Sequence, residues 1–396
     1  MSNMNLQHDE MVMEEEVKVS KTPKEKSTLT GIAGLDIDLV VTTKVGKELR
    51  QEIKNTVVTK EELRSIIDRY YQTQDKRIVL ENQIRAIKQG KDSASEFDPV
   101  NPLTCSILEW DLNQEKEKEA SYKTILDKMT DNNTVTKWIK SITGIGPIFA
   151  AALYAYLDVT KCSYASGFHQ YAGLNDNNRP WISSAKAKEI VDAVIGSGDI
   201  TDDGLIEIAA MTGWKVDYLK KRCYTMDEEG NITGTSKKNL QNAICMPPYN
   251  KNLKTIMWNI GESFVKVQNR GSLYGRLYAE RKAYETAKNE RGEYAEQAAR
   301  ELASKNYSKS TDAYAAYVEG KLPKGHINAR AKRWAVKLFL SHVFEEMYRE
   351  EYHKLPPMYY ALEHMDHHDY IGPEVQYTWG PEIPPTFTKE EVMQYK

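Results

Sequence analysis

The chain has 396 residues, 28% of them charged, and a mean hydropathy of −0.62. Its formal net charge is only −3, so any nucleic-acid surface must come from local segregation of charge and not from a global basic excess. No apolar run is long enough to cross a bilayer, the first residues are acidic, and the four cysteines form no CxxC pair. These features argue against a secreted disulfide scaffold or a membrane protein and predict a cytoplasmic protein without a membrane partner.

The N-terminal part divides into a tail and a first structural region. Residues 1–30 are polar, charged and poorly patterned, which is typical of a disordered tail. Within 31–130, the apolar run "GLDIDLVVTT" at 34–43 indicates a short strand-like segment.

Two long helices are expected in the rest of this region. The first spans 59–90, because Thr59 and Glu62 have capping-box spacing and Gly90 suits a helix C-terminus. The second spans 102–129. We predict an antiparallel hairpin that mediates self-association into a homo-oligomer, with simple packing inside one chain as the alternative.

The stretch "WIKSITGIGPIFAAALYAYLD" at 138–158 opens a domain over 131–270. An apolar helix leads into a Gly-Ile-Gly turn, and Pro147 suits the first turn of the next helix, which is a helix-hairpin-helix pattern. Glycine permits backbone conformations that a Cβ opposes, and free N–H groups at a helix start favour phosphate. The candidate phosphate-binding residues are Lys140, Gly144, Ile145 and Gly146. The alternative is a tight turn packed on Ala150 and Ala151.

An insert is expected over 187–245. In "DDGLIEIAAMTGWKVDYLKKRC" at 202–223, Ala209, Gly213 and Leu219 occupy the positions where a helix-turn-helix needs a small residue, a turn glycine and a buried aliphatic residue. The following "DEEGNITGTSKK" resembles a turn or a wing. The candidate DNA-binding cations are Lys215, Lys220, Lys221 and Arg222. The alternative is a plain structural insert.

The C-terminal region is predicted to be a helical domain over 271–354 and a Pro- and aromatic-rich tail over 355–396 that lies extended on the surface. Its last helix begins with Arg330, Lys332 and Arg333, which we expect either to contact DNA phosphate or to snorkel from a packed helix. The histidines of "EHMDHHDY" are interpreted as a surface polar patch and not as a metal site.

The turn and the sequence after it resemble the C-terminal domain of the insertion-sequence transposases of the IS-one-ten group, also called DEDD transposases or RNA-guided bridge recombinases. The resemblance covers 138–265, interrupted by the insert, and includes a later helix with Asn250, Asn252 and Lys254. The matching positions of the first block are Gly144, Ile145, Gly146, Pro147, Ala150, Ala151, Asp158, Phe168, Tyr171, Ala172, Gly173 and Leu174.

This resemblance implies duplex DNA and a guide RNA as partners and a serine nucleophile after the Tyr-Ala-Gly-Leu motif, for which Ser183 and Ser184 are the candidates. A helix cap is the alternative role for these serines. The family's N-terminal half is a ribonuclease-H-like domain with four carboxylates that bind Mg²⁺. Asp36 and Asp38 resemble part of its first strand, but 59–130 reads as two helices, so Mg²⁺ is expected only if nuclease-type chemistry is retained.

The sequence therefore predicts a mainly α protein: a helical hairpin plus a helix-hairpin-helix domain with an inserted helix-turn-helix-like segment. The expected function is DNA binding of the transposase or recombinase type, in transposition or recombination of a mobile element or phage. Whether the chain is an enzyme is left open. The alternatives are a non-catalytic accessory or architectural phage protein and a helical scaffold that contacts only protein.

Overall fold

A computed structural model describes most of the chain, and every described residue belongs to one unit, Thr42–Lys396. The described ranges are 46–89, 102–175, 181–226, 232–357, 369–382 and 386–388. They contain 15 α-helices and two pairs of short strands, which confirms the predicted mainly α class. None of these helices is both long and apolar enough to span a bilayer. The expected tail, the strand-like segment at 34–43 and the histidines at 364, 367 and 368 lie outside the described residues.

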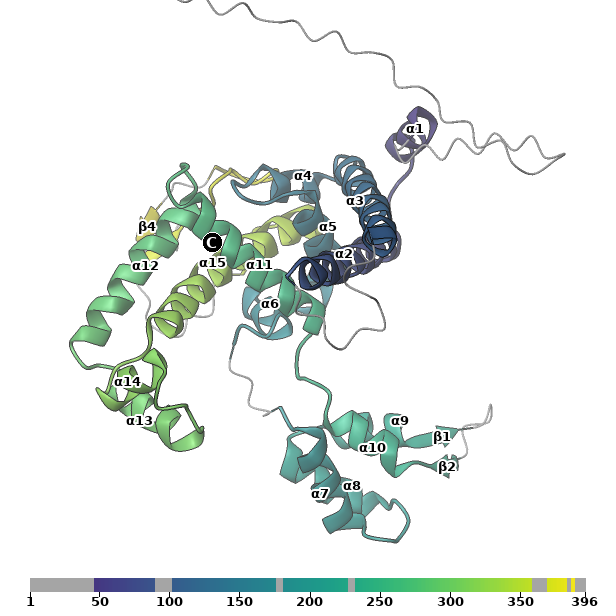
Figure 1. Ribbon diagram of the computed structural model, residues 1–396, viewed down its shortest axis with the longest axis vertical. Helices are drawn as coiled ribbons and strands as arrows, with labels where there is room; N and C mark the ends of the chain where they lie inside the picture. The colour runs from purple at the N-terminus through teal and green to yellow at the C-terminus, as the bar shows by residue number, and fades with distance from the viewer. Residues whose placement is uncertain are drawn as a thin grey trace, which may run out of the picture. The chain divides into compact units, whose positions relative to one another are not determined.

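The predicted hairpin is present. Helix α1 (Lys47–Asn55) precedes α2 (Lys60–Lys88) and α3 (Pro102–Thr130), and the last two run side by side (Figure 1). The N–H of Glu62 donates to Thr59 Oγ1 at 3.2 Å, and the N–H of Thr59 donates to Glu62 Oε2 at 2.8 Å, so the capping box is complete. The side chains of Arg77 and Glu119 form an ion pair across the hairpin at 2.5 Å.

Helix α15 is the centre of the helical body, where it packs against α12, α11, α6 and α4 (Figure 1). The body consists of α4 (Thr134–Ser141), α5 (Pro147–Tyr156), a 3₁₀ turn (Val159–Lys161), α6 (Ala165–Tyr171), α11 (Lys251–Val267), α12 (Leu273–Glu290), α13 (Ala295–Ser304), α14 (Asp312–Val318) and α15 (Lys324–Tyr352). Its core is aromatic: Phe264 stacks on Tyr274, and both rings meet the edge of Phe339.

The insert has a hydrophobic core of its own, and this core already includes Ile182 and Ala187. The structural segment therefore begins at about residue 181, earlier than the expected 187. Its elements are α7 (Ser184–Ile195), α8 (Asp202–Thr212), α9 (Val216–Cys223), β1 (Tyr224–Met226), β2 (Ile232–Thr235) and α10 (Lys237–Ile244). Strands β1 and β2 pair antiparallel, with Tyr224 opposite Thr235, which is the expected wing.

Residues 370–377 pack against the rest of the chain and are not an extended surface tail, which corrects that expectation. Strand β3 (Asp369–Ile371) pairs antiparallel with β4 (Thr386–Thr388), and Tyr370 and Tyr377 are buried. The indole N–H of Trp138 donates to the carbonyl oxygens of Val375 at 3.1 Å and Gln376 at 2.9 Å. The pattern of prolines and aromatic residues did not reveal this, because the contacts join positions more than 230 residues apart.

Candidate nucleic-acid interface

The glycines of the hairpin turn have different roles. Gly144 has a φ of 94°, in the left-handed region, and a Cβ there would lie 3.1 Å from both Ser263 Oγ and Val267 Cγ2 on α11. Gly144 therefore permits both the reversal of the chain and its close approach to α11. Gly146 is the N-cap of α5 and leaves the first turn of that helix without a side-chain cap, and a Cβ at this position would meet no atom within 4 Å. Ile145 is buried between them and offers no side chain to a ligand.

The carboxylate of Glu374 binds the backbone on the N-terminal side of this turn. Glu374 Oε1 accepts a 2.7 Å hydrogen bond from the N–H of Thr143, and Oε2 accepts one of 2.7 Å from the N–H of Leu273. The hydroxyl of Ser272, the N-cap of α12, donates to the same Oε2 at 3.4 Å. The N–H of Thr143 is therefore not free to bind an anion, and only the side of the turn at Gly146 and the first turn of α5 remains open to one.

Lys140 does not serve the turn as a free cation. Its ammonium forms ion pairs with Asp127, at 3.0 Å, and with Asp131. Burial lowers the pKa of Lys140, but the hydrogen bonds and charges of the two carboxylates outweigh this and raise the pKa. The expectation of Lys140 as a phosphate ligand is corrected, because its ammonium is held by Asp127 of α3 and by Asp131, which directly follows that helix.

The insert contains a helix-turn-helix. Helix α8 ends at Thr212, Gly213 has a φ of 72°, and α9 starts three residues later, after the N-cap Lys215. Leu219 is fully buried, and Ala209 packs against the same core. The three positions singled out in the sequence thus have the predicted environments.

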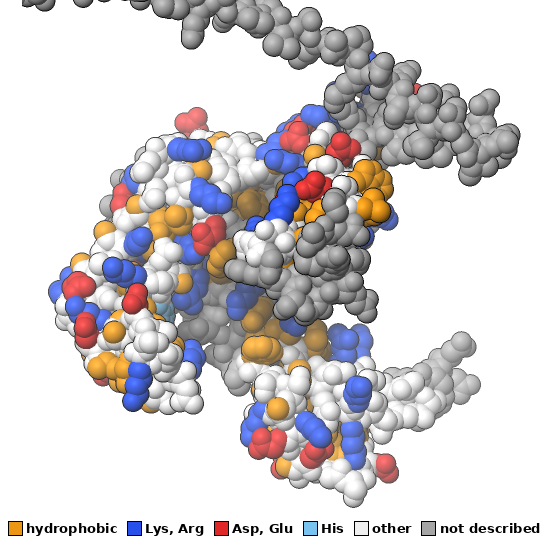
Figure 2. All heavy atoms as spheres, viewed as in Figure 1, with side chains coloured by type: hydrophobic (Ala, Val, Ile, Leu, Met, Phe, Trp, Pro, Cys, Tyr) orange, Lys and Arg blue, Asp and Glu red, His pale blue; other side chains and the backbone are white. Residues whose placement is uncertain are grey.

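The cations of α9 differ in their partners. Lys220 pairs with Asp202 at 2.6 Å, and hydrogen bonds from Lys220 and Tyr224 lower the pKa of that carboxyl. Lys215, Lys221 and Arg222 are exposed and have no ion-pair partner among the described residues. Figure 2 shows blue side chains along the part of the segment where α9 and α10 lie. Three of the four predicted cations therefore remain available to a phosphate.

The two candidate nucleophiles lie at the start of α7. Ser183 is its N-cap, and Ser183 Oγ accepts a 3.3 Å hydrogen bond from the N–H of Lys186. Ser184 Oγ lies 3.7 Å from Cys245 Sγ. The ammonium of Lys186 is paired with Glu189 at 2.7 Å, so neither serine has a base beside it within the described residues. This arrangement matches the alternative role of a helix cap.

The basic start of α15 separates into structural and free cations. Arg330 pairs with the buried Glu285 at 2.8 Å, and Lys332 pairs with Glu262. Arg333 is exposed and has no ion-pair partner among the described residues. The contact of Arg330 and Lys332 with DNA phosphate is corrected to core stabilisation, because their carboxylates come from the neighbouring helices α12 and α11.

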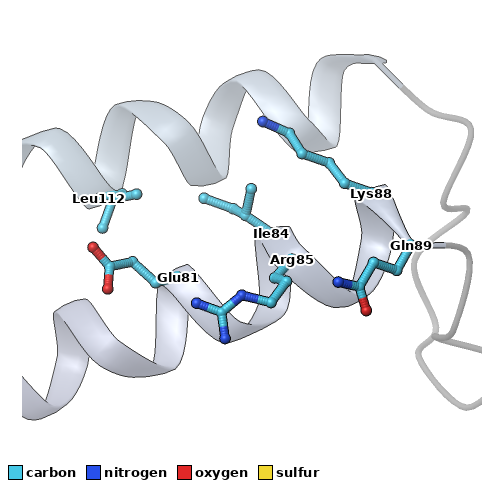
Figure 3. A pocket seen from close by; sticks show the side chains of 6 residues that line it. All are labelled: Glu81, Ile84, Arg85, Lys88, Gln89 and Leu112. Carbon is cyan, nitrogen blue, oxygen red and sulfur yellow. The ribbon is translucent and has the colours of Figure 1, made fainter.

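A hollow of about 420 Å³ lies between α2 and α3, near the C-terminal end of α2 (Figure 3). Its floor is formed by Ile84 and Leu112, and Lys88 at its rim is paired with Glu109 at 2.9 Å. It contains none of the residues singled out in the sequence, and we assign it no ligand.

No protein-family model, no curated protein and no solved structure matches this chain. A function must therefore be inferred from the geometry of these residues.

Proposed function

We propose that the protein binds duplex DNA through the helix-turn-helix of α8 and α9, with the β1–β2 hairpin as a wing. The observation that carries this proposal is the left-handed Gly213 turn followed by a helix whose cations at 215, 221 and 222 are exposed and unpaired among the described residues. A helix presented in this way can enter the major groove while its lysines and arginine neutralise phosphates. The acidic partners that occupy Lys140, Arg330 and Lys332 favour this segment over the other candidates.

The proposal is tested by duplex binding across a salt series. Each phosphate contact contributes about 0.9 to the slope of log affinity against log salt, so Lys221→Ala with Arg222→Ala should reduce the slope by about 1.8 and weaken binding. Lys76→Ala with Lys123→Ala removes two exposed cations of the α2–α3 hairpin and is the matched control. A wild-type affinity that does not depend on salt, or an unchanged slope in the first variant, contradicts the proposal.

Within this function, a role in transposition or recombination by an accessory or architectural protein has more support than strand transfer by the chain itself. Ser183 already caps α7, and Lys186 is neutralised by Glu189, so the loop lacks an activated nucleophile among the residues described. Strand transfer through Ser183 or Ser184 remains the second candidate. It requires a covalent protein–DNA adduct on a denaturing gel that disappears in the Ser183→Ala, Ser184→Ala variant.

A further inference from the structure

Trp258 is a large aromatic residue on the exposed face of α11. Its side chain is 61% exposed, whereas its neighbours Met257 and Ile260 are 1% exposed or less. One cation lies over its ring: Lys332 Nζ is 5.5 Å from the ring centroid. Among the described residues, Trp258 has no other ring contact and no hydrogen bond. Most of the indole is therefore available to a ligand.

The surface around Trp258 is basic although the whole chain is slightly acidic. The stretches 246–261 and 321–344 contain no Asp or Glu, and they include the first halves of α11 and α15, which pack together. The next carboxylate on α11, Glu262, lies four residues after Trp258 and is paired with Lys332. Lys251 and Lys254 precede Trp258 on α11 by seven and four residues, so the three share one exposed stripe. Lys254 Nζ lies 4.0 Å from the ring centroid of Tyr249, and neither lysine has an ion-pair partner among the described residues.

We propose that this surface, formed by Lys251, Lys254 and Trp258, binds single-stranded nucleic acid. An unpaired base stacks on the indole of Trp258, and the lysines on the same stripe contact the flanking phosphates, which is the combination used by sequence-tolerant single-strand binders. A protein partner fits less well, because lysine is depleted in the centres of protein interfaces. The ligand and the elements differ from those of the helix-turn-helix, so this inference goes beyond the proposed function.

The test measures the anisotropy of labelled oligothymidylate and oligouridylate of about 20 nucleotides bound to the full chain. Trp258→Ala should weaken binding about 5- to 150-fold, while duplex affinity stays unchanged. Trp110→Ala is the matched control, because Trp110 is 64% exposed on α3 but stands between Glu109 and Asp111. Lys251→Ala with Lys254→Ala should reduce the salt slope by about 1.4.

The outcomes separate the two proposals. Trp258-dependent binding of either oligonucleotide supports the inference. Equal binding indicates a site that does not distinguish the two strands, and a preference for one of them indicates the natural ligand. Wild-type protein that binds neither oligonucleotide overturns it, as does Trp258→Ala protein that binds like wild type. If Trp258→Ala changes only the sedimentation of the protein, the surface is a protein contact and the inference is wrong. Loss of duplex binding alone, with Trp258-dependent binding of single strands retained, contradicts only the proposed function.

Discussion

The backbone N–H of Thr143 donates a 2.7 Å hydrogen bond to the carboxylate of Glu374, which lies 231 residues further along the chain. The same carboxylate accepts from the N–H of Leu273 at the start of α12. One side chain of the C-terminal segment therefore holds together the hairpin turn and a second helix start.

Glu374→Ala should lower the free energy of unfolding by about 1–3 kcal/mol, because two partly buried N–H groups lose their acceptor. Glu374→Gln keeps one acceptor oxygen and should cost less. Urea unfolding measures both, with the exposed Glu382→Ala as the control in the same segment. Equal stability of Glu374→Ala and wild type would show that water replaces the carboxylate.

The two turn glycines should respond differently to alanine. Gly144→Ala places a Cβ at a φ of 94° and 3.1 Å from Ser263 Oγ, and we expect it to cost at least about 1 kcal/mol of stability. Gly146→Ala meets no atom within 4 Å and should stay within about 0.5 kcal/mol of wild type. Thermal unfolding of both variants tests this pair, and similar losses at both positions would contradict the structural difference.

His342 should make stability depend on pH. The ring is fully buried, its Nε2–H donates to the carbonyl of Ile371 at 2.8 Å, and Nδ1 accepts from the hydroxyl of Tyr274 at 2.7 Å. Burial lowers the pKa of His342 from 6.5 to about 4, although the bond to Ile371 opposes this. The unfolded chain therefore binds a proton that the folded chain does not.

The contribution of His342 is fully present above pH 6.5 and is lost as the pH falls towards 4, at up to about 1.4 kcal/mol per pH unit. Urea unfolding at several pH values should show a smaller slope in His342→Gln, while the exposed His353→Gln keeps the wild-type slope. Parallel curves for His342→Gln and wild type would mean that other groups cause the pH dependence.

Substitutions of Arg330 and Arg333, two neighbouring cations of α15, should have different effects on stability and on nucleic-acid binding. Arg330→Ala leaves the buried Glu285 with Arg281 as its remaining ionic partner among the described residues, and we expect a loss of about 1–3 kcal/mol. Arg333→Ala should change stability by less than about 0.5 kcal/mol. Because Arg333 is exposed and has no ion-pair partner among the described residues, its loss is expected to weaken nucleic-acid binding. Chemical unfolding and oligonucleotide binding are measured on both variants. If Arg330→Ala protein is as stable as wild type but binds nucleic acid more weakly, the expectation from the sequence that Arg330 contacts phosphate is correct.

Ser183 should behave as a helix cap. Ser183→Ala should cost about 1 kcal/mol, and Ser183→Asn should recover most of it, because an asparagine oxygen can accept from the N–H of Lys186. Thermal unfolding gives the stability, and the adduct assay gives the chemistry. An adduct that is lost in Ser183→Asn while stability is recovered would assign a catalytic role to the hydroxyl.

Features that depend on a few consecutive residues were predictable from the sequence. The capping box at Thr59 and Glu62, the reversal at Gly144 and the turn at Gly213 all follow from local backbone requirements, and the structure confirms each of them. The same local logic placed the helix-turn-helix and its wing.

Which charged side chains form ion pairs and which remain free was not predictable from the local sequence. Lys140 and Arg330 look like free cations in sequence, but their carboxylate partners come from other helices and are set by tertiary packing. The same holds for Trp258, whose position in a helix was predicted. Its exposure depends on which face of α11 meets α15, and the local sequence does not determine that face.

The insert leaves and rejoins the helical body at one place. The N–H of Asn250 donates to the carbonyl of Tyr171 at 2.9 Å, and its side-chain amide donates to the hydroxyl of the same residue at 3.0 Å. Because these two bonds close the body independently of what lies between them, the length and content of that stretch are not constrained by the body's packing. The position is a natural attachment point, at which one inserted segment can be exchanged for another without rebuilding the fold that carries it.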